Sequence, residues 1–385
     1  MRNIVNLEDV RQMAHRRLPR FVFDFVDGGA EDEVTLRANR RAFEQITFRS
    51  RVLVGVSERD MSTTVLGVPV KMPVLLSPAG AHRLMCREGE LAAARAAGRE
   101  GTVFALSTAS SYSIEEVAAV ATEPLWFQLY TLRNPEATKA LVERAQKAGY
   151  KALCITVDTA VRGNRERDLR NKVNLPPRVT WNKLPDLMWR PLWVRDFLLK
   201  PQFVPKNFID MEPVRGKPFK AVWEYLDKGF IDNQAFNWDD LAGLRKLWHG
   251  PLIVKGVMAA EDAKRALDYG VNGIVVSNHG GRQLDGLPAT VEVLPEIAKA
   301  VAGNAEVFID GGIRRGADVV KAIALGARAC LIGRPYMFGL AMGGEAGVTQ
   351  VLQILRSEID RTLALLGCRK LADVNHTTVR TTFSP

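Results

Sequence analysis

The chain has 385 residues, 47% of them hydrophobic and 25% charged, which is the composition of an ordinary globular protein with a large core. Its formal net charge of +10 favours an anionic substrate, cofactor, membrane surface or nucleic acid without choosing among them. The N-terminus is too charged for a signal peptide and no long uncharged apolar span follows, so we expect a cytoplasmic protein or one that lies on a membrane without crossing it.

After an N-terminal helical segment, short apolar runs alternate with helical patterns. The runs are almost continuously apolar, as in parallel strands buried on both faces. They predict strands near residues 72–77, 102–107, 125–130, 152–157, 251–255, 273–277, 306–310 and 329–333. Helical patterns lie between most of them. Eight such units predict an α/β protein with a TIM (β/α)8 barrel in one domain over residues 1–385, and a doubly wound open sheet is the alternative.

The connection between the fourth and fifth predicted strands is far longer than an ordinary one. Its residues 177–211 mix aromatic and aliphatic side chains with cations. We consider three interpretations: a lid over the barrel mouth, a segment docked on an anionic membrane, or a packed surface excursion. The membrane hypothesis depends on six cations and five aromatic residues: Arg178, Lys183, Arg190, Arg195, Lys200 and Lys206, with Trp181, Trp189, Trp193, Phe197 and Phe203.

Polar side chains follow every predicted strand. Because chemistry in this fold gathers where the strands end, these residues are expected to form one site. They include Ser77, Ser107, Gln128, Tyr130, Thr156, Asp158, Lys255, Ser277, His279, Arg282 and Asp310. The last two loops add glycines with Arg314 and Arg334, a pattern that favours a phosphorylated cofactor or substrate.

Other chemistries remain open at this point. Lys255 could be a Schiff-base lysine of an aldolase, a phosphate partner or a cation beside an electron-rich ring. A barrel that binds a phosphate ligand without catalysis is a further alternative. His82 is the only rival to His279 as the functional histidine, and no Cys/His cluster or HExxH pattern predicts a metal. Cys154 and Cys330 lie in apolar runs and are expected in the core.

The stretch SNHGGRQLDG, at 277–286, resembles the active-site signature of the FMN-dependent L-2-hydroxy acid dehydrogenases and oxidases. The segments LPRFVFDFVDGGAEDE, LSTAS, WFQLY, TVD, RERDLRN, VKG, DGGIRRG and LIGRP match the same family in order along nearly the whole chain. STAS, DTAVRGNRERDLRN and FNW are most similar to the (S)-mandelate dehydrogenase branch, whose membrane-associating insertion the 177–211 segment resembles.

The resemblance implies that FMN is the cofactor and that an L-2-hydroxy acid, mandelate-like or lactate-like, is oxidised to the 2-keto acid. It implies His279 as the general base, oriented by Asp158, and places Tyr130 near the substrate hydroxyl. Arg282 and Arg165 would bind the substrate carboxylate. Lys255 would offset negative charge on the reduced flavin.

The remaining flavin contacts are implied in two groups. The ring would be held by Ala79, Gly80, Ser107, Gln128, Thr156, Lys255 and Ser277, and the ribityl phosphate by Asp310, Gly312, Arg314, Gly333 and Arg334.

Three residues depart from the common family pattern. Phe25 replaces a tyrosine whose hydroxyl usually meets the substrate carboxylate, Ala109 replaces a bulky aromatic residue of the members with small substrates, and Gly80 replaces an alanine. A larger, aromatic substrate is therefore favoured over glycolate.

The resemblance also implies partners. We expect a membrane quinone as the electron acceptor, with O2 in an H2O2-forming oxidase as the alternative. We also expect a homotetramer that binds no nucleic acid. We expect it to lie peripherally on the inner face of the cytoplasmic membrane.

Overall fold

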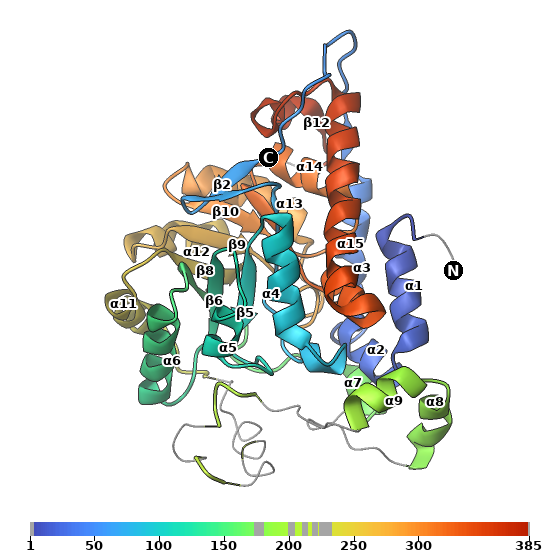
Figure 1. Cartoon of the computed structure of the whole chain (residues 1–385). Coiled ribbons are helices and arrows are strands. Elements are labelled where there is room, and N and C mark those ends of the chain that lie inside the picture. Colours follow the sequence, from blue (N-terminus) through green and yellow to red (C-terminus); the bar gives the residue numbers. More distant parts are fainter. Residues whose placement is uncertain are drawn as a thin grey trace.

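A computed structural model describes residues 4–172, 181–198, 205–209, 215–217, 222 and 233–383. Its centre is a closed barrel of eight parallel strands in the order β10-β11-β4-β5-β6-β7-β8-β9 (Figure 1). The strands are β4 (Val74–Leu76), β5 (Phe104–Ser107), β6 (Leu125–Tyr130), β7 (Ala152–Thr156), β8 (Leu252–Val257), β9 (Gly273–Val276), β10 (Glu306–Ile309) and β11 (Ala329–Ile332). All eight lie where the apolar runs predict them, which confirms the TIM barrel and excludes the open sheet.

The strands are apolar on both faces because each face packs against its own layer. Alternate residues such as Leu75, Trp126 and Phe308 fill the barrel interior, and Trp126 and Phe308 meet edge to face with ring centroids 5.3 Å apart. The hairpin of β2 (Thr63–Val65) and β3 (Val68–Val70) packs on this interior cluster. Cys154 and Cys330 are fully buried, as predicted.

A ring of helices covers the outer face of the barrel. These are α4 (Gly89–Glu100), α5 (Ile114–Ala118), α6 (Pro135–Lys147), α11 (Trp238–Leu247), α12 (Ala260–Asp268), α13 (Thr290–Val301), α14 (Gly316–Ala324) and α15 (Arg334–Leu366). Several end as the sequence predicts; α4, for example, stops at Gly101, which takes the left-handed conformation with φ of 65°.

The expected N-terminal helical segment consists of α1 (Leu7–Arg17), α2 (Arg20–Asp27) and α3 (Val34–Glu44). Helix α1 begins with a capping box in which the Asn6 side chain accepts from the backbone N–H of Asp9, and the Asp9 side chain accepts from that of Asn6. Strand β1 (Thr47–Phe48) pairs with β12 (Val379–Arg380) and ties this segment to the C-terminus.

The long connection between β7 and β8 begins with α7 (Glu166–Arg170) and continues through η2 (Trp181–Lys183), α8 (Leu184–Met188) and α9 (Pro191–Leu198). Parts of the predicted 177–211 insertion, with Arg178, Lys200 and Phe203, lie outside the described residues. Residues 181–198 pack beside α2 and the η1 turn (His82–Leu84) (Figure 1). Residues 205–209 lie instead at the loop after β5, where the Asn207 side chain donates to the Thr108 carbonyl at 3.1 Å.

Candidate active site

The loops that follow β7 and β9 bring His279 and Asp158 together. The Nδ1 of His279 lies 3.1 and 3.2 Å from the two carboxylate oxygens of Asp158. Burial lowers the pKa of His279, and the attraction of Asp158 offsets this only in part. Burial alone would raise the pKa of Asp158, but His279 holds it below its ordinary value. Asp158 is therefore an ionised acceptor for the Nδ1 hydrogen, and Nε2 of the neutral ring keeps the lone pair that a base needs.

Lys255 lies inside the barrel mouth with 3% of its surface exposed. Its Nζ donates to the Ser277 hydroxyl at 2.7 Å and pairs with a carboxylate oxygen of Asp310 at 2.8 Å. Burial alone would lower the pKa of Lys255, but Asp310 and Asp158 outweigh it and the pKa is raised. A Schiff-base lysine needs the opposite shift, so this lysine is a fixed cation.

Two buried polar atoms beside these residues have no partner within the described part of the chain. Gln128 accepts from the Ser107 hydroxyl at 2.9 Å through Oε1, which leaves its Nε2 donor unused. The second carboxylate oxygen of Asp310 is also unused. A buried donor and a buried acceptor without partners are expensive, and a flavin or its ribityl chain carries the carbonyl, ring nitrogen and hydroxyl groups that would complete them. The residues present therefore fit FMN.

Four guanidinium groups gather at the same end of the barrel, those of Arg165, Arg282, Arg314 and Arg334. Burial and the neighbouring Arg165 and Arg334 lower the pKa of Arg282 well below its usual value. Burial together with Arg334 and Arg40 lowers the pKa of Arg314 to about 9. Because these cations repel one another, the site favours anions, as a substrate carboxylate and a cofactor phosphate would supply.

The geometry separates the roles of the predicted arginines. Arg334 donates to the backbone oxygens of Val26, Gly28 and Gly280 at 2.8–3.0 Å, so three of its nitrogens already bind the protein. Arg282 uses one nitrogen, Nη1, for the carbonyls of Phe25 and Gly28. The Arg165 Nε donates to the Arg282 carbonyl at 3.4 Å, which joins the two residues predicted to bind the carboxylate.

The other predicted residues lie around this core. Burial raises the pKa of Tyr130, and the charges that act on it include Arg165, Asp158 and Lys255, so its ring lies in the same site. Thr156 ends β7 and is 1% exposed.

The loops after β4 and β5 meet each other, and the loop after β11 leaves free space at Gly333. A Cβ added at Gly80 would lie 3.4 Å from the Cβ of Ala109, so the loops after β4 and β5, the first of which carries Ala79, meet there. A Cβ at Gly333 would meet no atom within 4 Å.

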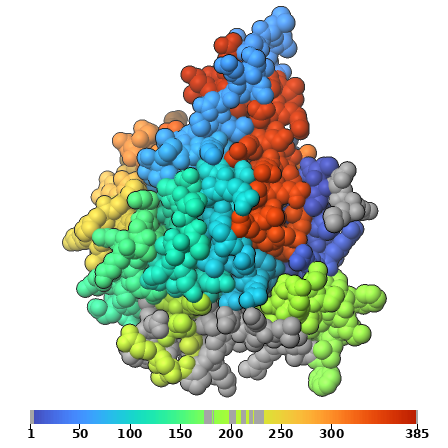
Figure 2. Space-filling view, viewed as in Figure 1, coloured from blue at the N-terminus to red at the C-terminus, as the bar shows by residue number. Residues whose placement is uncertain are grey.

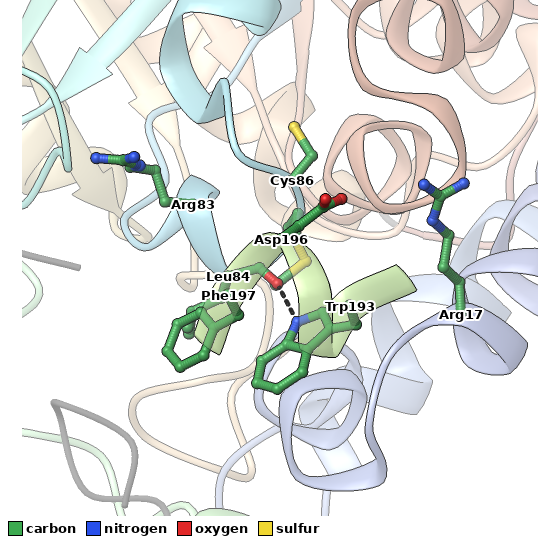
Figure 3. Close-up of a pocket in the computed structure, with 8 residues that line it drawn as sticks. Arg17, Arg83, Leu84, Cys86, Trp193, Asp196 and Phe197 are labelled. Carbon is green, nitrogen blue, oxygen red and sulfur yellow. Dashed lines mark hydrogen bonds between the residues drawn. The ribbon is translucent and has the colours of Figure 1, made fainter. Parts of the chain in front are cut away.

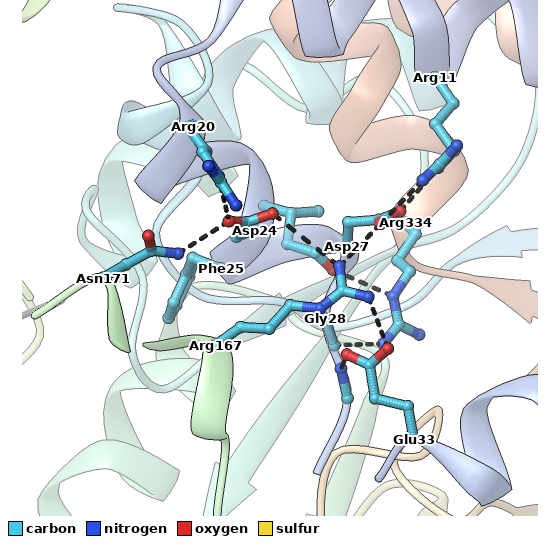
Figure 4. A network of polar contacts seen from close by, with 12 residues as sticks. Arg11, Arg20, Asp24, Phe25, Asp27, Gly28, Glu33, Arg167, Asn171 and Arg334 are labelled. Atoms are coloured by element: carbon cyan, nitrogen blue, oxygen red, sulfur yellow. Dashed lines mark hydrogen bonds and ion pairs between the residues drawn. The ribbon is translucent and has the colours of Figure 1, made fainter. Parts of the chain in front are cut away.

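A salt-bridge network that the sequence did not predict closes the N-terminal segment onto the site (Figure 4). Arg167 of α7 pairs with Glu33 at 2.6 Å and with Asp27 at 3.3 Å, and Asp27 also pairs with Arg11 at 2.7 Å. The network fixes α2, whose Phe25 lies under the Arg282 guanidinium at 5.4 Å from the ring centroid. The charge alternation of RERDLRN was the available signal, but it does not identify the partners.

His82, the rival histidine, belongs to a different cluster. Its Nε2 lies 2.9 Å from the Tyr336 hydroxyl and its Nδ1 3.3 Å from a carboxylate oxygen of Glu90, with both residues of that pair fully buried. It is held in the packing beside α4, away from Asp158.

A small pocket where α9 meets the η1 turn and α1 is also not the active site. Arg17, Cys86 and Asp196 are among its lining residues, and none of the predicted site residues is (Figure 3). Across the described ranges, no group of three or more His, Cys, Asp or Glu residues could hold a metal ion.

Comparisons with known proteins agree with this geometry. A family model described as FMN-dependent dehydrogenase matches residues 14–381. The L-lactate oxidase of Nostoc sp. is 44% identical over 375 residues, 96% of this chain and 96% of the oxidase. The crystal structure of the monotopic membrane protein (S)-mandelate dehydrogenase matches with a TM-score of 0.93 and 41% identity, covering 99% of this chain and 100% of that one. A soluble mutant of the membrane-associated (S)-mandelate dehydrogenase from Pseudomonas putida matches with a TM-score of 0.85 and 40% identity over 98% of this chain and 100% of that one.

These matches extend over nearly the whole length of the chain and of its relatives. They overturn two alternatives, the lysine-dependent aldolase and the phosphate-binding barrel without catalysis, and the raised pKa of Lys255 already argues against the first. The chain belongs to the FMN-dependent dehydrogenase family, and it is a flavoenzyme that uses FMN to oxidise a 2-hydroxy acid.

Proposed function

We propose that this enzyme oxidises a bulky L-2-hydroxy acid, of the size of mandelate, on the inner face of an anionic cytoplasmic membrane and passes the electrons to a membrane quinone. The observation that carries the proposal is an exposed apolar surface on η2, α8 and α9, and the small residues Gly80 and Ala109 support the size of the substrate. The proposal treats residues 1–385 as one domain and, on family resemblance alone, the assembly as a homotetramer without nucleic acid.

His279 is the general base of the proposed reaction. It takes a proton from the substrate at Nε2, because Asp158 accepts the hydrogen on Nδ1. As the ring becomes an imidazolium, Asp158 stabilises its charge from 3.1 Å. When bound, FMN supplies the two-electron acceptor that side chains cannot provide.

The substrate is oriented by the cations and by Tyr130. Arg282 and Arg165 bind its carboxylate, since guanidinium groups match carboxylate geometry. Tyr130, which ends β6, donates to the substrate oxygen that becomes the ketone. Lys255 remains protonated and offsets the negative charge that the flavin gains.

The cofactor is held along the strand ends. Gln128, with its unused Nε2, would hold the ring together with Ser107, Thr156, Ser277, Ala79 and Gly80. Gly312, Arg314 and Gly333 would hold the phosphate, and the unused carboxylate oxygen of Asp310 would accept from a ribityl hydroxyl. Arg334 contributes charge more than hydrogen bonds, because backbone carbonyls already occupy three of its nitrogens.

Two residues favour a bulky substrate. Ala109 carries only a methyl group, and it lies against Gly80, so neither loop fills the space beside the flavin. Phe25 stacks with Arg282 but lacks a hydroxyl for the carboxylate, a loss of about 1 kcal/mol of binding that burial of an aromatic substrate can offset.

The proposed membrane surface consists of Trp181, Leu184, Met188, Trp189 and Leu192. Trp181 is 88% exposed, and Met188 and Trp189 are each 80% exposed. The α8–α9 segment stands out from the body of the molecule (Figure 2). Tryptophan and methionine at such exposure cost free energy in water and gain it at a lipid interface. Within the described residues, no helix combines the length and apolar character needed to cross a bilayer.

The cations of this segment contribute less than the sequence suggests. Lys183 is 8% exposed and lies over the Phe21 ring, and Lys206 pairs with Glu116 at 2.5 Å. Arg190 donates to the Leu18 carbonyl. The proposed docking is therefore mainly apolar, and we expect a weak dependence on salt.

Substrate and acceptor can be tested together. The purified enzyme should be yellow, and L-mandelate should reduce its flavin anaerobically with a higher kcat/KM than glycolate does. Ala109→Trp should reverse this preference by filling the pocket, with L-lactate less affected. A wild type that prefers glycolate would remove the argument from pocket size.

The oxidase alternative is supported by the similarity to L-lactate oxidase. After reduction by substrate, the flavin should be reoxidised faster by a short-chain quinone than by dissolved O2. Rapid formation of H2O2 at a rate equal to turnover would favour the oxidase.

A further inference from the structure

The turn that carries His279 has an unfavourable backbone conformation. His279, Gly280 and Gly281 are three consecutive left-handed residues, with φ of 57°, 64° and 73°. Glycine adopts this conformation freely, but a histidine does not. Such a conformation persists where surrounding contacts impose it, so the contacts that hold this turn bear on where the base points.

One set of these contacts depends on a residue from outside the barrel. Asn39 of α3 and Asn278, the residue before His279, are each 1% exposed and form a reciprocal amide pair. The Asn39 Nδ2 donates to the Asn278 Oδ1 at 2.8 Å, and the Asn278 Nδ2 donates to the Asn39 Oδ1 at 2.9 Å. Two buried amides that satisfy each other in this way fix both side chains.

The backbone around the pair determines its orientation. The Asn278 Oδ1 also accepts from the Gly281 N–H at 3.2 Å, and its Nδ2 donates to the Pro288 carbonyl at 3.1 Å. The Asn39 Oδ1 also accepts from the Thr290 N–H at 3.2 Å. Neither amide can flip without facing a donor with a donor or an acceptor with an acceptor. Asn278 therefore clamps the far end of the left-handed turn to the loop that follows it.

Asn39 also contacts the loop after β10. A Cβ at Gly312 would lie 2.0 Å from the Asn39 carbonyl oxygen, and one at Gly311 would lie 3.3 Å from its Cγ. One residue of α3 thus contacts both Asn278, next to the turn of the base, and the loop proposed to hold the cofactor phosphate.

We propose that Asn39 is a positioning residue for proton transfer: through its amide pair with Asn278 it fixes the left-handed turn that aims the imidazole of His279. The proposal rests on the proposed role of His279 as the base. Asn39 acts through Asn278 and does not contact the substrate.

The test compares Asn39→Ala, Asn39→Asp, Asn278→Ala and the double variant Asn39→Ala/Asn278→Ala. Asn39→Asp keeps the shape and the acceptor used by Thr290 but presents an oxygen to the Asn278 Oδ1, so it remains informative if an alanine variant does not fold. The measurements are the bound FMN per chain, the affinity for the 2-keto acid product from the flavin spectrum, and the anaerobic rate of flavin reduction at saturating L-mandelate and L-lactate.

We expect each single alanine variant to retain FMN and to bind the keto acid within about threefold of wild type, but to reduce its flavin about 10- to 100-fold more slowly, because small misplacements of reacting groups cost rate. Asn39→Asp should show a smaller loss. The double variant should be no slower than the slower single variant, because both residues act through one contact.

A control variant separates positioning from stability. Leu141→Ala removes a fully buried side chain on α6, so it should lower Tm without slowing flavin reduction. If Leu141→Ala slows reduction as much as Asn39→Ala does, loss of stability explains both and the proposal fails.

Three other results overturn it. Wild-type reduction rates in Asn39→Ala would show that the pair does not aim the base. If the affinity for FMN or for the keto acid fell as much as the reduction rate, Asn39 would support the structure of the whole site and not the position of the base alone. Losses that multiply in the double variant would show that the two residues act separately. A wild-type rate of flavin reduction in His279→Gln would instead show that His279 is not the base, and the proposed function would then fail.

Discussion

The turn of His279 and the α8–α9 segment both depend on contacts from beyond the barrel strands, but they are held differently. The turn is bound from several sides: Arg334 donates to the Gly280 carbonyl at 2.9 Å, and Ala30 donates to the Gly281 carbonyl at 2.8 Å. Asn278 adds the buried amide pair. The backbone of this turn has little freedom.

The α8–α9 segment is attached along one side. Asp186 accepts from the Arg20 N–H at 2.6 Å, and Trp193 donates through its indole N–H to the Leu84 carbonyl at 2.8 Å (Figure 3). Trp193 is 4% exposed and stacks on Phe197, whereas Trp189 on the other side is 80% exposed.

The difference follows from what each region has to do. Proton transfer depends on the position of one nitrogen to within a fraction of an ångström, so the turn that carries His279 is held by several hydrogen bonds. Docking on a surface depends on apolar area and tolerates movement. The comparison can be tested by substituting residues in each region and measuring flavin reduction and vesicle binding separately.

The largest effect is expected at the base. His279→Gln should keep FMN bound and lose about 10²- to 10⁴-fold in the rate of flavin reduction, because glutamine cannot accept the proton. Anaerobic stopped-flow absorbance with excess L-mandelate measures this rate. Near-normal reduction would make His279 a structural residue and would leave the held turn without a chemical purpose.

A second effect concerns pH. The pKa of His279 lies below its ordinary value of 6.5, so the base stays neutral at neutral pH and reduction should slow only as the pH falls through that lowered pKa. Asp158 raises the pKa of His279, so in Asp158→Asn the fall should move to still lower pH.

In Asp158→Asn the maximal rate should also drop by roughly 10²- to 10³-fold, since the buried imidazolium loses its counter-ion. Rates of flavin reduction measured from acid to neutral pH, on the wild type and on Asp158→Asn, give both the maximal rate and the pH at which the rate falls. A fall that moves to higher pH in Asp158→Asn would contradict the assigned pairing.

Much of this site could be predicted from sequence because strand ends in a barrel meet. His279, Asp158 and Lys255 each follow or end an apolar run, and the fold then brings them together. The chemistry was indicated by the SNHGGRQLDG stretch, which resembles the active-site signature of the FMN-dependent 2-hydroxy acid enzymes.

What supports the site could not be predicted. Asn39 and Asn278 are separated by 239 positions, and nothing in a helical stretch such as ANRRAF indicates that its asparagine meets the turn of the base. The same holds for Arg167, whose partners Asp27 and Glu33 belong to the N-terminal segment. Lys183 counted as a surface cation in the sequence, but the fold buries it over Phe21. Pairings between distant segments depend on the fold and leave no local pattern.

The smallest effect is expected at the docking surface. Trp181→Ser/Trp189→Ser removes two exposed indoles that the protein itself scarcely contacts, so Tm and anaerobic flavin reduction should stay at wild-type values. Each indole should contribute roughly 1–2 kcal/mol to lipid binding, so the affinity for anionic vesicles, measured by sedimentation, should weaken by about 5- to 30-fold per side chain. Val52→Ser/Leu53→Ser is the matched control, because these residues are 81% and 102% exposed on a loop at the other end of the molecule (Figure 1).

Raising the salt concentration should release the wild type only weakly, since Lys183, Arg190 and Lys206 already have partners within the protein. If the wild type ignores vesicles, or if the control variant loses as much binding as the tryptophan variant, the α8–α9 surface is not the docking site.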